Sequence, residues 1–154
     1  MSAATFMSST ESVSMERGTK AEAEVYLEKA EQFFRTMKEA QENEDWDAVG
    51  MNAIHCVISS NDALLGFRHG IRSASGSHAD AVELLGQYDR SADSRNNAVR
   101  LDRMLKKKHL VEYDGRSLSA SELAAMRLRQ AFDDSRVRIP PSPSETCYVT
   151  SWPT

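Results

Sequence analysis

Residues 19–69 read TKAEAEVYLEKAEQFFRTMKEAQENEDWDAVGMNAIHCVISSNDALLGFRH, and this stretch decides the fold class. Apolar residues recur in it every three or four positions, which is the spacing of one face of an α-helix. Thr19 and Glu22 have the spacing of a capping box. The sequence therefore predicts a first helix over about 20–43.

A second helix is expected directly after it, over about 46–69. The polar residues 43–45 form the turn, and Asp45 is a suitable N-cap. This second helix is apolar around most of its circumference, which is typical of the central helix of a bundle. Two long helices joined by so short a turn are expected to form an antiparallel hairpin.

Three more helices are expected downstream, over about 78–88, 93–113 and 120–138. Capping boxes precede the first and the last of them, and a hydrophobic staple adds to the last start signal. The residues that carry these signals are Ser77, Asp80, Leu118, Ser119, Glu122 and Leu123. The chain is thus predicted to be all-α, an up-and-down bundle of four to five helices.

The chain divides by composition into three parts. Residues 1–18 are rich in Ser and Thr and are expected to be disordered, residues 19–139 form the helical domain, and residues 140–154 are a Pro/Ser/Thr-rich tail. All four prolines lie in that tail, so the helical domain contains none of them.

Composition excludes several classes of protein. The chain has 154 residues, is 40% hydrophobic and has a formal charge of −4, which is typical of a globular domain and not of a wholesale basic nucleic-acid binder. No apolar run approaches the ~20 residues that span a bilayer. Cys56 and Cys147 make neither a disulfide framework nor a four-ligand metal site, so we expect reduced thiols in a cytoplasmic protein. The familiar cofactor and metal motifs are missing, and no cofactor or metal is expected.

Charge is sorted along the chain. Residues 90–116 contain eight basic and four acidic side chains, a net of +4, whereas residues 16–47 contain five basic and ten acidic ones, a net of −5. The basic stretch indicates either a phosphate-binding footprint, or a solvated helix face, or a helix that pairs its charges with the acidic first helix. Its members include Arg95, Arg100, Arg103, Lys106, Lys107, Lys108 and His109.

Lys108 falls on the apolar stripe of the predicted helix 93–113, between Leu105 and Val111. Glu112 is one turn further on, at the spacing of an ion pair, and Tyr113 follows it. A charged pair on the inward side of a bundle helix is either a structural pair or a site.

The predicted second helix carries one narrow polar strip, at spacings of three, four and three residues. This strip is either an exposed stripe, or the seam of a dimer, or a groove facing the helix 93–113 with Asp62 or His55 near Lys108. Its members are Asn52, His55, Ser59 and Asp62.

Three segments together resemble a bacterial HEPN domain. They are WDAVGMNAIHCVISSNDALLGFR at 46–68, SGSHADAVELL at 75–85 and KKKHLVEYD at 106–114. In one branch of that family, which lacks toxin activity, the last segment commonly reads R-x-x-A-D-Y. Lys108, Val111, Glu112 and Tyr113 match that form, with Lys for Arg and Glu for Asp.

The resemblance implies a homodimer in which the helix 93–113 of each copy lines a shared cleft. In many members that cleft cuts RNA without a metal ion, and this needs a proton carrier and a cation that holds the developing phosphate charge. Here no histidine stands at the family's catalytic position. His109 follows Lys108 directly, so it points about 100° away around the helix.

We therefore expect a non-catalytic HEPN-like module that binds RNA or a partner protein, such as a nucleotidyltransferase. The alternatives are a divergent metal-independent endoribonuclease of toxin–antitoxin type, with Lys108 and Glu112 as catalytic candidates, and an unrelated cytoplasmic helical scaffold. The candidate binding residues are His55, Asp62, His78, Arg100, Arg103, Lys106, Lys107, His109 and Tyr113.

Overall fold

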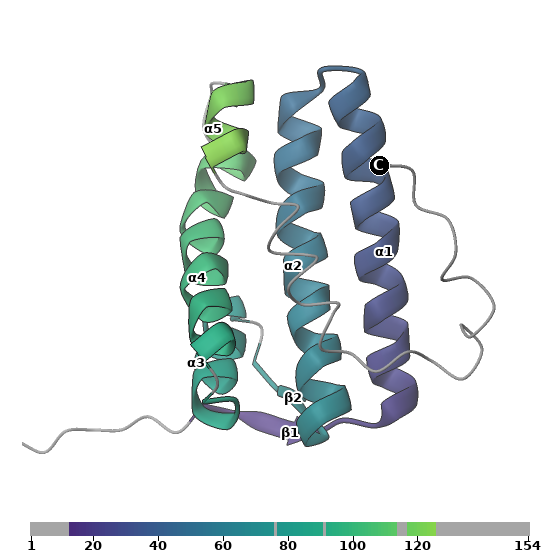
Figure 1. Cartoon of the computed structure of the whole chain (residues 1–154), viewed down its shortest axis with the longest axis vertical. Helices are drawn as coiled ribbons and strands as arrows, with labels where there is room; N and C mark the ends of the chain where they lie inside the picture. Colours follow the sequence, from purple (N-terminus) through teal and green to yellow (C-terminus); the bar gives the residue numbers. More distant parts are fainter. Residues whose placement is uncertain (1–12, 76, 91, 114–116, 126–154) are drawn as a thin grey trace, which may run out of the picture.

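The computed structural model describes residues 13–75, 77–90, 92–113 and 117–125, with the backbone alone at 93, 94, 97, 109–113 and 125. This described part is an all-α helical bundle with one short two-stranded ribbon, which confirms the predicted fold class (Figure 1). In chain order the elements are β1 (Met15–Arg17), α1 (Lys20–Glu42), α2 (Trp46–His69), β2 (Ile71–Ser73), α3 (His78–Tyr88), α4 (Ala92–Tyr113) and α5 (Ala120–Ala125).

The predicted hairpin of two long helices is confirmed. The backbone N–H of Thr19 donates to Glu22 Oε2 at 2.8 Å and that of Glu22 donates to Thr19 Oγ1 at 3.2 Å, which completes the capping box of α1. Asp45 stands at the N-cap of α2, but its side chain makes no capping hydrogen bond. Gly70 ends α2 in the left-handed conformation at φ 64°, where glycine carries no steric penalty.

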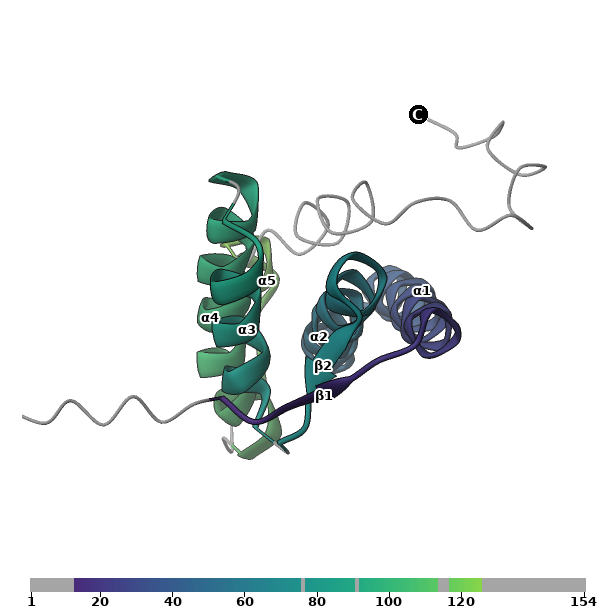
Figure 2. The same cartoon turned by 90° about the horizontal axis from the view of Figure 1, so that it is seen from below.

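α2 is the central helix, as its sequence predicted. α1 lies on one side of it, and α3, α4 and α5 lie on the other (Figure 2). Its side chains enter two buried clusters, one shared with α1, α4 and α5 and one shared with α1, β2 and α3. The α2 residues buried there include Val49, Ala53, Ile54, Val57, Ile58, Leu64 and Leu65.

α3 is joined to α2 by polar contacts as well as apolar ones. Asn61 Nδ2 donates to the backbone oxygen of Ala81 at 3.2 Å, and Arg68 donates to the Asp89 carboxylate at 3.0 Å. Ser77 precedes α3 as predicted, but it makes no side-chain cap. Its backbone N–H donates instead to Ser75 Oγ at 3.0 Å.

The start of α5 matches the sequence pattern. The backbone N–H of Ser119 donates to Glu122 Oε2 at 2.9 Å, and Leu118 and Leu123 are both buried in the staple positions. The Leu118 N–H donates to Asp47 Oδ1 at 2.7 Å, which attaches this segment to the start of α2. The predicted continuation to residue 138, the tail 140–154 and Cys147 lie outside the described residues.

The prediction that residues 1–18 are disordered is wrong for residues 15–17. Met15–Arg17 forms β1, which pairs antiparallel with β2 so that Glu16 stands opposite Arg72. Each strand has three residues, and along the chain β1 precedes the α1–α2 hairpin and β2 follows it. No hairpin turn connects the two strands, and each is too short to show alternating apolar and polar residues. No local sequence signal therefore indicates the pairing.

None of the helices in the described part of the chain is both long and apolar enough to span a membrane.

The close approach of α1 and α2 gives the first prediction. A Cβ added to Gly66 would lie 2.8 Å from the Cβ of Ala23, whereas one added to Gly86 of α3 meets nothing within 4 Å. Gly86→Ala should therefore stabilise the protein by about 1 kcal/mol through helix propensity. Gly66→Ala gains the same propensity but should be destabilised by about 1–3 kcal/mol through overpacking.

Urea denaturation of both variants measures this difference. Gly86→Ala is the matched control, because it makes the same substitution inside a helix without the steric contact. Equal free energies of unfolding for the two variants would show that α1 and α2 do not need this close contact.

Candidate functional site

Lys108, the centre of the site expected from the sequence, is half-buried on α4. It lies on the same side of the helix as Leu101 and Met104, which are buried in the cluster shared with α2. The side chains of His109, Glu112 and Tyr113 lie outside the described residues, so the pairing of Lys108 with Glu112 stays a prediction.

The polar strip of α2 faces α1 and not α4. The His55 ring stacks on Phe33 of α1, with 5.2 Å between the ring centroids and 28° between their planes. Asn52 Nδ2 donates to the backbone oxygen of Ala48 at 2.8 Å, and Ser59 is buried. The interpretation that the strip is a groove facing α4 is therefore wrong, and so is the interpretation that it is simply exposed.

Asp62, the last member of the strip, has its charged neighbours on α1 and β2 and not on α4. The two positive charges that act on it are those of Arg72 in β2 and Lys29 in α1. The expectation that Asp62 or His55 lies beside Lys108 is therefore wrong. His78, another candidate, is half-buried at the first position of α3.

The basic side chains of α4 gather on its outer side. We call Arg95, Arg103, Lys106 and Lys107 the basic face, because all four are exposed; the first three lie opposite the buried Leu101 and Met104, and Lys107 lies on the adjoining flank. Val99 lies among them with 49% of its surface exposed. Lys106 pairs with Asp102 at 2.7 Å, and Arg100 is half-buried at the edge of the face.

The acidic α1 does not neutralise the basic face. α2 stands between α1 and α4 in both views of the molecule (Figures 1 and 2). The interpretation that these two helices lie together with their charges paired is therefore wrong. The basic face is left as a solvated surface or a binding surface.

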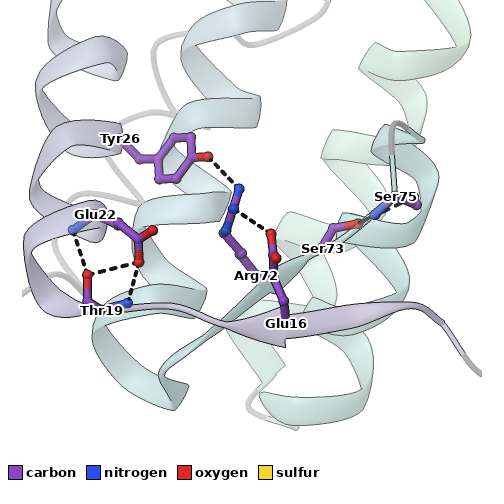
Figure 3. Close-up of polar contacts among 7 residues, drawn as sticks. All are labelled: Glu16, Thr19, Glu22, Tyr26, Arg72, Ser73 and Ser75. Carbon is purple, nitrogen blue, oxygen red and sulfur yellow. Dashed lines mark hydrogen bonds and ion pairs between the residues drawn. The ribbon is translucent and has the colours of Figure 1, made fainter.

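A second group of polar side chains, of which the sequence analysis named only Asp62, lies where α1, α2 and the ribbon come together. We call Glu16, Tyr26, Lys29, Asp62 and Arg72 the polar corner. Figure 3 shows Arg72 reaching from β2 to two other elements: its Nη1 donates to the Tyr26 hydroxyl at 3.1 Å, and its Nη2 pairs with the Glu16 carboxylate. Lys29 Nζ lies 5.0 Å from the centroid of the Tyr26 ring, a cation–π contact.

Two members of the polar corner are left without complete hydrogen bonding in the described part of the chain. Arg72 Nε is buried and has no partner there. The Asp62 carboxylate accepts no hydrogen bond from a described residue. Of the two, Asp62 is half-buried and Arg72 Nε is fully buried, and a buried polar atom in this state is uncommon and calls for an explanation such as a bound water.

Electrostatics differ sharply between the carboxylates of this region. Burial raises the pKa of Asp62 to about 6, although the charges of Arg72 and Lys29 act in the opposite direction. The backbone and side chain of Thr19 lower the pKa of Glu22 through hydrogen bonds. Burial lowers the pKa of Arg72, but the interactions of its guanidinium with Tyr26 and Glu16 raise that pKa by more. The pKa of Arg72 therefore lies above its ordinary value.

The described residues contain no group of three or more His, Cys, Asp or Glu side chains placed to hold a metal ion. Comparison with known proteins finds no protein-family model, no curated protein and no solved structure that matches the chain.

The raised pKa of Asp62 predicts a pH-dependent stability. In the unfolded chain an Asp titrates near about 3.9. The folded protein therefore holds an extra proton between about pH 4 and 6, and the stability from this group, fully present below about pH 4, is lost as the pH rises through about 6. Asp62→Asn removes the buried charge and should raise the free energy of unfolding at about pH 7 by about 2–3 kcal/mol.

The measurement is the difference in unfolding free energy between variant and parent, followed by urea denaturation from about pH 4 to pH 8. Asp102→Asn on the outside of α4 is the control and should give a small difference that does not change with pH. A difference for Asp62→Asn that is equally flat would contradict the burial of its charge.

Proposed function

We propose that this chain is a HEPN-like helical module that binds RNA along the basic face of α4 and does not cleave it. The observation that carries the proposal is the position of α4. Its inner side packs on α2 and α3, while its outer side presents four exposed basic side chains. The resemblance of the motif from Lys108 to Tyr113 to one branch of the HEPN family agrees with this choice of helix.

The dimensions of the basic face suit a nucleic-acid backbone. Arg95 and Lys107 are 12 positions apart, which corresponds to about 18 Å along the helix. Lysine and arginine over such a length neutralise several phosphates and release their counterions. The exposed Val99 adds an apolar contact within the face.

Binding without cleavage is favoured by the surroundings of the histidines. Cleavage of RNA without a metal needs a group that moves a proton from the ribose 2′-hydroxyl. Two of the four histidines are engaged in aromatic contacts: His55 is stacked on Phe33, and His69 lies 5.9 Å from the Tyr88 ring. We include in the proposal a cytoplasmic homodimer whose two α4 helices face a common cleft, with a nucleotidyltransferase as the alternative partner.

Fluorescence anisotropy with a labelled single-stranded RNA of about 20 nucleotides tests the proposal. Removing two charges in Arg103→Gln/Lys107→Gln should weaken binding about tenfold at low salt. It should also reduce the slope of log K against log salt concentration by about 1.4, since each lost contact to a single strand contributes about 0.7.

The matched control is Arg35→Gln/Lys38→Gln, which removes the same charge from exposed positions of α1. Equal weakening in the two double variants would mean that net charge and not the basic face governs binding. The same RNA should stay intact with excess chelator. Cleavage that survives chelator and disappears in Lys108→Ala would replace the proposal with the endoribonuclease alternative.

A further inference from the structure

The exposed apolar side chains of the molecule fall into two groups. Met15 and Tyr88 contact each other, since the Tyr88 hydroxyl donates to Met15 Sδ at 3.0 Å. Val25 of α1 and Val99 of α4 complete the set of large exposed apolar side chains in the described part of the chain, with 48% and 49% of their surfaces exposed. A single exposed valine is common on protein surfaces, so the charges around these two decide whether they mark an interface.

Val25 lies beside acidic side chains. We call Glu24, Val25 and Glu28 the acidic patch, because all three are exposed on the side of α1 that points away from its buried residues. Neither glutamate makes a hydrogen bond or ion pair with a described residue. Lys29, the next residue, makes a cation–π contact with Tyr26 instead. The acidic patch therefore presents an apolar centre with two negative charges that the described residues leave unpaired.

Val99 has the opposite surroundings. Arg95 and Arg103 stand one turn before it and one turn after it, and both are exposed on the same side of α4. Neither is paired with a described residue, whereas Lys106 already pairs with Asp102 at 2.7 Å. The centre of the basic face is thus an exposed valine between two arginines.

These two surfaces are complementary but cannot meet within one chain, because α2 stands between α1 and α4 (Figures 1 and 2). We propose that the acidic patch of one copy of this chain docks on the basic face of a second copy, with Val25 against Val99. The contact removes both valines from water. It also brings two carboxylates to two guanidinium groups, which form the stronger class of hydrogen bond.

The placement of the two surfaces determines the kind of assembly. The acidic patch and the basic face point away from α2 on opposite sides, so one partner does not cover both (Figure 2). Each copy then binds one neighbour through α1 and another through α4, which is a heterologous, head-to-tail contact. One helix face of each copy makes a small interface beside the standard total of about 1,600 Å². We therefore expect weak, reversible assembly that grows with protein concentration.

The docked copy covers Arg95 and Arg103, so it and RNA exclude each other on the basic face. Two basic faces opposite one another repel unless an anion lies between them. The α1–α4 contact therefore belongs to the RNA-free protein, and a cleft between two α4 helices belongs to the RNA-bound one. The head-to-tail assembly does not rest on RNA binding, and its test contains no RNA.

Sedimentation equilibrium of the full chain at low salt, over a range of concentrations, measures the assembly. The average mass of the parent should rise above that of one chain. Glu24→Arg/Glu28→Arg should lower the association constant by about thirtyfold, because each reversal replaces an attraction with a repulsion of similar size. Glu39→Arg/Glu42→Arg is the matched control: it makes the same charge change at exposed positions of the same helix and should assemble like the parent.

Restoration by complementary charges separates docking from misfolding. Arg95→Glu/Arg103→Glu should also fail to assemble alone, but an equal mixture of the two double-reversal variants should assemble like the parent. The proposal is overturned by a parent that keeps the mass of one chain up to about 1 mM. Assembly that persists in Glu24→Arg/Glu28→Arg, equal losses in that variant and the matched control, or a mixture that stays dissociated overturns it as well.

Discussion

The close packing of α1 against α2 is the contact on which the rest of the structure depends. The near approach of Gly66 to Ala23 and the stacking of His55 on Phe33 hold the two helices in one antiparallel register. Because α1 covers one side of α2, the other side is available for α3, α4 and α5. The same register brings Gly18 and Gly70 within hydrogen-bond distance, so the strands before α1 and after α2 meet. The ribbon and the polar corner are therefore products of the helical hairpin.

Much of the fold was predictable because its signals are local. The capping boxes at Thr19 and Ser119 act within one turn of helix, and apolar periodicity identifies the buried side of α1 without knowledge of its partner. The ribbon was not predictable, since Glu16 and Arg72 are paired only through the fold of everything between them. A three-residue strand with all its side chains exposed has no alternation for a sequence pattern to detect.

The candidate site shows the same division between what is local and what is not. Periodicity correctly grouped His55, Ser59 and Asp62 on one strip, but it does not say which neighbouring helix covers that strip. The sequence left open an exposed stripe, a dimer seam and a groove facing α4, and the strip lies beside α1. Arg72 carried no signal, because a single arginine two residues after a helix-ending glycine has no characteristic spacing. Its role appears only when β2 is placed against Tyr26 and Glu16.

The two charged regions of the molecule are built on opposite sides of α2 and share no residue. The polar corner belongs to α1, α2 and the ribbon, whereas the basic face belongs to α4 alone. Energetic coupling between them would require an element with two discrete arrangements that both sites bias. α2 and α3 both pack on α4 and on the ribbon in the described part of the chain, and α2 is in addition buried against neighbours on both sides. A helix packed in this way resists rearrangement, because any shift opens voids on one side and overpacks the other. A change at Asp62 and a change in the phosphate contacts of α4 should therefore alter the stability of the chain independently of each other.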